Sequence, residues 1–313
     1  MKKVFCKMAL AAVLALTTLF TGCKAPSSGG GSAYNPPEKN IPLTLEAIAD
    51  GQITFNRFDK ISNLKYRIND GEVTAATDTG ISLPAGDKIS LFAEGTLNGD
   101  SLDQAFRIIC SSDCYVYGNV MSLLTADYQT ATEITQNYAF AGLFFNNSHI
   151  KNHPSKNIVL PATTLADNCY MGMFYNCSSL TQAPVLPATT LADYCYYGMF
   201  EDCTSLTQAP VLPATTLATI CYGYMFSGCT SLTQAPALPA TTLAKNCYYC
   251  MFYGCTSLNK VTCLATDLSA IGCTDYWLTG VASSGTFTKA SGADWSVKTG
   301  YNGIPDGWTT QNK

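Results

Sequence analysis

The order of apolar and polar positions repeats every 26 residues in the middle of the chain, in blocks that begin at Leu160, Leu186, Leu212 and Leu238. In the first block apolar residues recur at intervals of four, at Leu165, Cys169 and Met173. That spacing places their side chains on one face of a short helix. Asn176 follows, and the other blocks have Asp202, Gly228 and Gly254 there, residue types that tolerate the left-handed backbone at a helix end. Each block is therefore predicted to begin with a short helix.

The second half of each block predicts a strand. Leu180, Ala183 and Val185 follow the spacing L-x-x-L-x-L, which we expect to point inward from a short extended segment. Pro184, and its equivalents Pro210 and Pro236, stand inside this segment and have no N–H to donate to a neighbouring strand. We therefore expect strands of only a few residues.

One block is too small to bury a core alone, so the repeats are predicted to stack on one another. A degenerate copy at 142–147 precedes the regular blocks, and the last copy decays over 258–263, as expected for units that cover the ends of an array. The predicted fold class is an α/β leucine-rich-repeat solenoid of short strands and short helices over residues 118–267.

The segments on either side of the repeats differ from them. Residues 41–117 contain short apolar runs, at 43–47, 52–55, 64–68, 88–92 and 105–109, separated by turn residues such as Asp50-Gly51. This pattern predicts a small all-β, sandwich-like domain, which we interpret as a cap of the repeats without an activity of its own. The tail, 268–313, contains Trp277, Phe287, Trp295 and Trp308 and is predicted to be a C-terminal cap that covers apolar surface.

The N-terminus resembles the export signal of a bacterial lipoprotein. A basic start, Met1-Lys2-Lys3, precedes an apolar run from Met8 to Phe20 that is too short to span a bilayer, and Phe20-Thr21-Gly22-Cys23 resembles a lipobox. We expect cleavage of residues 1–22, lipidation of Cys23, and a flexible Gly/Ser/Pro tether over 23–40. Because Phe20 replaces the usual leucine, a plain secretory signal without lipid is the alternative.

Composition limits the partners and the chemistry. The chain of 313 residues has a formal net charge of −4 and only 13% charged residues, which argues against nucleic acid as a partner. The two histidines, His149 and His153, are predicted to be exposed turn residues, and no catalytic motif accompanies them. We therefore expect a protein that is not an enzyme and that uses no cofactor.

The fifteen cysteines do not follow the pattern of a disulfide framework. Eight of them occupy two equivalent positions of the blocks, so we expect two ladders of buried free thiols: Cys169, Cys195, Cys221, Cys247, and Cys177, Cys203, Cys229, Cys255. Cys110/Cys114 and Cys263/Cys273 are weaker candidates for disulfides. Cys247 and Cys250 have the spacing of a zinc ligand pair, but nothing completes four ligands, and no metal site is expected.

The repeat sequence resembles the BspA-like leucine-rich-repeat proteins of bacterial surfaces. The residues that carry the resemblance are L-P-A-T-T-L-A-x-x-C-Y-x-x-M-F-x-x-C-T-S-L-T-Q-A-P between Leu160 and Leu258, with 117–123 and 303–308 on either side. The resemblance implies a lipid-anchored protein of the outer membrane or cell surface, with adhesin-like attachment to host matrix proteins or other bacteria.

The candidate binding face follows from the predicted strands. Alternation is expected to point one row of residues away from the core, namely Gln182, Pro184, Gln208, Pro210, Gln234, Pro236 and Lys260. This polar row is predicted to contact an extracellular protein or a glycan, although a row that serves solubility alone is the alternative. Exposed tyrosines on the outer face form a second candidate: Tyr175, Tyr197, Tyr249 and Tyr253. The alternative function is an envelope-structural or passive surface-coat protein without a specific ligand.

Overall fold

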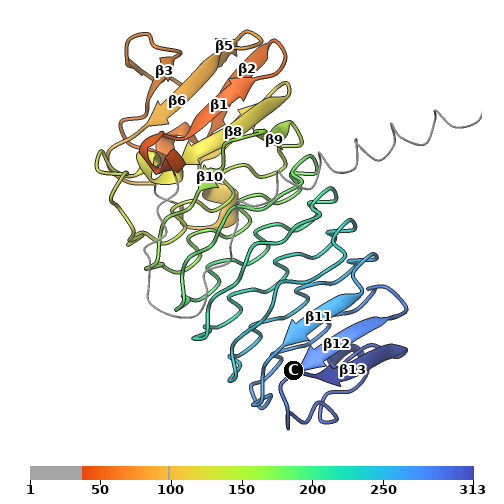
Figure 1. Cartoon of the computed structure of the whole chain (residues 1–313). Helices are drawn as coiled ribbons and strands as arrows, with labels where there is room; N and C mark the ends of the chain where they lie inside the picture. The colour runs from red at the N-terminus through yellow and green to blue at the C-terminus, as the bar shows by residue number, and fades with distance from the viewer. Residues whose placement is uncertain (1–36, 98) are drawn as a thin grey trace, which may run out of the picture. The chain divides into compact units, whose positions relative to one another are not determined.

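The computed structural model describes residues 37–97 and 99–313. Strands paired into sheets come first, and a series of coils follows, each coil beside the next along the chain (Figure 1). The predicted signal peptide, Cys23 and most of the predicted tether lie outside the described residues. Within them, no helix has the length and apolar character needed to span a membrane.

The N-terminal part consists of short strands joined by turns, and all five apolar runs predicted as strands form strands. In chain order its elements are η1 (Pro37–Asn40), β1 (Thr44–Ala47), β2 (Gly51–Asn56), η2 (Phe58–Lys60), β3 (Lys65–Ile68), β4 (Thr74–Ala75), β5 (Ile81–Leu83), β6 (Lys88–Phe92), η3 (Leu102–Gln104), β7 (Arg107–Cys110), β8 (Cys114–Asn119) and η4 (Val120–Leu123). Buried and half-buried positions alternate in Lys88–Phe92, because one face of the sheet covers the core.

Two sheets make up this part. One has the order β5-β2-β7, and the other has the order β10-β8-β1-β6-β3-β4, with β9 also paired to β8. The strands β9 (Ile150–Asn152) and β10 (Ile158–Val159) belong to the first coil and run parallel to β8. Strand β8 therefore connects the N-terminal sheet directly to the coils, and the predicted boundary between Tyr117 and Gly118 falls inside it.

The coils contain no α-helix, and the predicted α/β leucine-rich-repeat solenoid is wrong. The only helical segments of the described chain are short 3-10 turns, and its regular structure is three sheets. An α-helix needs every N–H to bond the carbonyl four residues earlier. Here alternate residues donate to the next coil instead, as Tyr170 does to the carbonyl of Cys195 at 3.0 Å. The residues between them close tight turns, as Met171 does to Asn168 at 3.1 Å.

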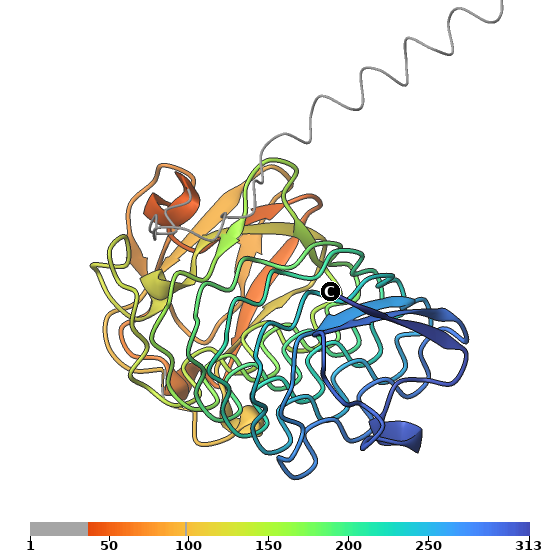
Figure 2. The same ribbon diagram turned by 60° about the horizontal axis from the view of Figure 1, so that its bottom comes forward.

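The apolar spacing of four comes from these consecutive turns. Every fourth residue has a positive φ, at Asn168 (60°), Gly172 (56°) and Asn176 (52°), and the other coils repeat the pattern. A left-handed residue in each turn stops the chain from winding into a helix. The interval of four residues between apolar positions, interpreted from the sequence as helical, therefore comes from a series of consecutive turns. The regular blocks nevertheless lie on one another, joined by these bonds (Figure 2).

The predicted strands are reduced to isolated bridges over most of the stack, including Gln182 with Gln208 and Gln234 with Lys260. A regular parallel sheet forms only where the sequence has no proline in this position. It consists of β11 (Lys260–Cys263), β12 (Gly285–Lys289) and β13 (Trp308–Asn312), preceded by η5 (Gly300–Asn302). The missing N–H of proline explains why the earlier coils form no such ladder.

The inward direction of the predicted strand is also partly wrong. Val185 and Val211 are exposed by 44% and 61%, whereas Pro184 and Pro210 are buried. A buried proline leaves no N–H without a partner, so this position suits the interior better than the alternation rule suggests.

Identical side chains form continuous buried columns through the stack. Phe174, Phe200, Phe226 and Phe252 stack with ring centroids 5.5–5.7 Å apart and nearly parallel planes. The two predicted cysteine ladders are buried and unpaired, which confirms that prediction, and Cys203 Sγ donates to the carbonyl of Phe174 at 3.1 Å. The candidate pairs Cys110/Cys114 and Cys263/Cys273 are likewise free thiols.

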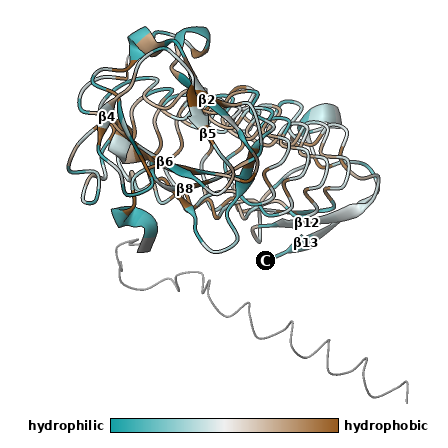
Figure 3. Ribbon diagram, turned by 90° about the horizontal axis from the view of Figure 1, so that it is seen from above, coloured by the Kyte–Doolittle hydropathy of each residue, from teal (hydrophilic) through white to brown (hydrophobic). Residues whose placement is uncertain are grey.

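The columns end in the C-terminal aromatic residues. Trp277, Phe287 and Trp295 are buried and contact one another with centroids 4.9–5.9 Å apart, and Trp277 Nε1 donates to the carbonyl of Gly303 at 2.9 Å. Trp277 stacks on Tyr248, the last tyrosine of its buried column, with ring centroids 6.2 Å apart. Along the coils, hydrophobic and hydrophilic segments alternate (Figure 3).

Candidate functional site

The predicted binding face is present only in part. Gln182, Gln208, Gln234 and Lys260 are exposed and follow one another from coil to coil. Of the prolines in the same prediction, Pro184 and Pro210 are buried and Pro236 is half-buried, so they do not line this surface. What remains is a column of neutral amides that ends in one lysine. The lipidation site, Cys23, lies outside the described residues.

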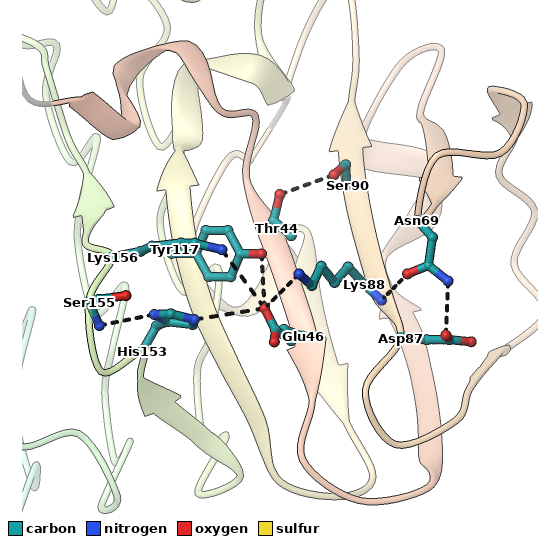
Figure 4. Close-up of polar contacts among 10 residues, drawn as sticks. All are labelled: Thr44, Glu46, Asn69, Asp87, Lys88, Ser90, Tyr117, His153, Ser155 and Lys156. Carbon is teal, nitrogen blue, oxygen red and sulfur yellow. Dashed lines mark hydrogen bonds and ion pairs between the residues drawn. The ribbon is translucent and has the colours of Figure 1, made fainter.

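A second polar cluster joins the N-terminal sheet to the first coil (Figure 4). Glu46 of β1 accepts a hydrogen bond from the hydroxyl of Tyr117 at 3.1 Å, and Lys88 lies 3.6 Å from the same carboxylate oxygen. His153 and Lys156, from the loop between β9 and β10, approach that oxygen to 3.8 and 4.0 Å. The carboxylate of Glu46 in β1 thus contacts residues from two neighbouring strands, β6 and β8, and from one loop.

The surroundings of the histidine in this cluster disfavour its charged form. His153 is only 13% exposed, so the prediction of an exposed turn residue is wrong for it. Burial, and then the positive charge of Lys156, hold the pKa of His153 below its ordinary value. The backbone N–H of Ser155 donates to Nδ1 at 3.1 Å, so the proton of the neutral ring is on Nε2, which faces Glu46. The polar groups of the cluster hydrogen-bond or pair with one another. We interpret the cluster as a structural contact between the sheet and the first coil rather than a reactive site.

A row of tyrosines on the outside of the stack is the feature that sequence reasoning recognised only in part. Five rings on five successive coils form it, and we call Tyr197, Tyr224, Tyr249, Tyr276 and Tyr301 the tyrosine row. Successive ring centroids lie 5.5, 5.4, 6.3 and 5.7 Å apart. The first three rings are half-buried, and the last two are exposed by 44% and 68%. Tyr197 and Tyr249 were predicted from the sequence as surface tyrosines, whereas Tyr224, Tyr276 and Tyr301 were not.

The row was difficult to find because it alternates between two neighbouring positions of the repeat. Tyr197, Tyr249 and Tyr301 share one position, and Tyr224 and Tyr276 occupy the next one along the chain. The residue beside each ring is small or polar: Gly198, Gly223, Cys250, Asp275 and Asn302. A Cβ on Gly223 would lie 3.1 Å from a ring carbon of Tyr197, so this glycine makes room for the ring of the preceding coil. In the sequence, the row could have been found as tyrosines that recur every 52 residues at each of these two positions.

Two members of the row have an unfavourable backbone conformation. Tyr224 and Tyr276 have φ values of 55° and 57°, where the equivalent Gly172 and Gly198 have 56° and 57°. The left-handed conformation costs a residue with a side chain roughly 1–2 kcal/mol, and glycine avoids that cost. Tyrosine is therefore present at these positions at the expense of stability.

Carboxylates accompany the row. Asp275 belongs to the same position of the repeat as Tyr249, and the carboxylate of Glu201 lies against Gly198, next to Tyr197. At the C-terminal end, Tyr301, Leu278, Pro305 and Asp306 line a cavity of about 380 Å³. Among residues 37–97 and 99–313, no group of three or more His, Cys, Asp or Glu residues is placed to hold a metal ion.

The raised pKa of Glu201 predicts that the free energy of unfolding depends on pH. Burial, and then the charge of Asp202, raise the pKa of Glu201 to about 7. Because the unfolded carboxyl titrates near its ordinary value of about 4.3, the folded state binds more protons between the two values and loses stability as the pH rises through them. The variant Glu201→Gln cannot ionise, so we expect it to be more stable than the parent at pH 8, by about 1 kcal/mol because partial exposure screens the charge.

Urea unfolding at pH 4 and pH 8 measures this difference. The two proteins are expected to have similar stability at pH 4, and Asp70→Asn, a change at an exposed turn, serves as the control with no such shift. An unchanged difference between parent and Glu201→Gln across this pH range contradicts the assignment.

The chain matches no protein-family model, no curated protein and no solved structure. The resemblance to the BspA-like proteins therefore stays a prediction from the repeat sequence.

Proposed function

We propose that this protein is a cell-surface binding protein, anchored by a lipid on Cys23, that attaches in an adhesin-like manner to host matrix proteins, glycans or other cells. The observation that carries the proposal is the arrangement of exposed side chains in columns across the coils. The glutamines at 182, 208 and 234 form one such column, and the tyrosine row forms another. A repeated surface of this kind offers the same contact several times to an extended partner.

The electrostatics support a partner other than nucleic acid. The net charge of −4 and the small number of charged groups on the coils give no basic surface for phosphates. Threonine and glutamine are instead frequent among the exposed side chains of the coils, and tyrosines are half-buried or exposed there. Such side chains contact proteins and sugars through hydrogen bonds and aromatic rings.

Binding of the purified chain to matrix proteins, to glycans and to whole bacterial and host cells tests the proposal. Saturable binding to at least one of these, weakened when Gln182, Gln208 and Gln234 are changed to alanine or when the tyrosine row is altered, is the expected result. A chain that binds none of them saturably is instead a passive coat protein, the alternative function.

The lipid anchor is tested separately. Intact-mass measurement of the protein from the membrane fraction is expected to show a chain that begins at Cys23 and carries acyl chains, which anchor it by burying methylene groups at about 0.8 kcal/mol each. An unmodified N-terminus at residue 23 indicates the plain secretory signal.

A further inference from the structure

We propose that the tyrosine row is a binding site for a linear, uncharged polysaccharide that lies along the direction of the stack, with one sugar unit on each ring. This inference rests on the proposed function and names the ligand class for one of its surfaces.

The first argument is the geometry of the row. Each coil contributes one ring, and the spacing of 5.4–6.3 Å between centroids is comparable to the length of one sugar unit in an extended β-1,4-linked chain. The first three pairs of rings are tilted by 59°, 67° and 85°. Unlike the buried phenylalanine column, the row reaches the surface, and its last two rings, Tyr276 and Tyr301, are exposed by 44% and 68%.

The second argument is that the row is continuous although its rings alternate between two positions of the repeat. The positive φ of Tyr224 and Tyr276 belongs to the turns of the coils, since Cys250 has a φ of 51° at the same position. In each coil one of two adjacent positions has the tyrosine and the other has a small or polar residue. Gly223, for example, makes room for Tyr197, so the row is continuous although the ring changes position from coil to coil.

The third argument is the chemistry around the rings. Sugars present apolar C–H faces, which pack on aromatic rings, and hydroxyl groups, which hydrogen-bond to carboxylates and phenol groups. Glu201, Asp275 and Asp306 supply such acceptors along the row. The negative charge of Asp275 and Asp306 disfavours sulfated or phosphorylated chains, so an uncharged polysaccharide fits the row better. Five rings in a line, rather than around a point, suit a polymer better than a single cationic group.

The test uses the purified full chain and soluble β-1,4-linked glucose oligosaccharides of increasing length, measured by calorimetry. We expect the affinity to rise with each added sugar up to about the number of rings. The variants Tyr224→Gly and Tyr276→Gly remove a ring and relieve the backbone at the same time, so they keep the fold. Each is expected to weaken binding of the longer oligosaccharides about tenfold.

The control is Val73→Ala, which shortens an exposed apolar side chain in the N-terminal part, outside the row, and is expected to leave the affinity unchanged. Oligosaccharide binding that survives both glycine variants overturns the inference, as does stronger binding of a sulfated polysaccharide or of choline. Absence of oligosaccharide binding, in a chain that still binds a matrix protein or cells, overturns the inference but leaves the proposed function. Absence of all binding overturns both.

Discussion

Replacing Phe200 with alanine is expected to lower the free energy of unfolding by about 3–5 kcal/mol, the range measured for buried phenylalanines. Phe200 is 0% exposed and stands between Phe174 and Phe226, with centroid distances of 5.5 and 5.7 Å. Its loss opens a cavity that interrupts the phenylalanine column of the core. The flanking coils cannot close this cavity, because the backbone hydrogen bonds between coils fix their separation.

Urea unfolding followed by circular dichroism measures this loss. Val211→Ala is the matched control, since Val211 is 61% exposed on a neighbouring coil position and its truncation is expected to change stability by less than about 0.5 kcal/mol. Equal effects of the two substitutions contradict the picture of a continuous buried column.

Gly118→Ala is expected to lower the free energy of unfolding strongly, although it adds only one methyl group. Gly118 lies in β8 with a φ of 90°, and a Cβ there would lie 2.1 Å from the carbonyl oxygen of Pro42. That atom belongs to the backbone and cannot move away, because Pro42 and Asn119 are paired by a bridge. We expect a loss of at least about 3 kcal/mol, or failure to fold, since both the backbone conformation and the close contact are violated.

The control for this prediction separates the two causes. Gly86 has nearly the same φ, 88°, but a Cβ there meets nothing within 4 Å. Gly86→Ala therefore carries only the backbone cost of roughly 1–2 kcal/mol. If the two alanine variants are equally stable in urea unfolding, the contact with Pro42 does not contribute.

Each coil contains positions that form the core and positions that form the surface, and the two kinds vary differently between blocks. Positions that face inward are identical from block to block, such as the phenylalanine column and the cysteine ladders. The positions of the tyrosine row vary in a coordinated way. Near-identical repeats provide a rigid support, and the variation at two outer positions provides the surface proposed to bind sugars.

Several parts of the fold were predictable from local sequence. The strands of the N-terminal part follow from short apolar runs between turn residues, and Lys88–Phe92 shows the expected alternation of burial. The burial of the cysteine ladders follows from their equivalent positions in the repeat. Neither inference needs distant contacts, because both depend on patterns within a few residues or on exact repetition.

The conformation of the block was not predictable in the same way. A spacing of four fits both an α-helix and a run of turns, and the choice depends on whether alternate N–H groups find acceptors in the next coil, as Tyr170 finds Cys195. Asn168 and Gly172, four residues apart, were the local evidence for turns. The equivalent positions in other coils hold Ile220 and Tyr224, which hide that evidence.

The stacking of 26-residue blocks, the burial of the leucine and cysteine columns and the strands of the N-terminal part all followed from the sequence. The turn conformation of the blocks, the inward position of Pro184 and the joining of tyrosines from alternating positions into one row depended on contacts in the folded chain. The physical reason is that repetition specifies which residues are neighbours across coils. The direction in which each backbone N–H points depends on the neighbouring coil that accepts it.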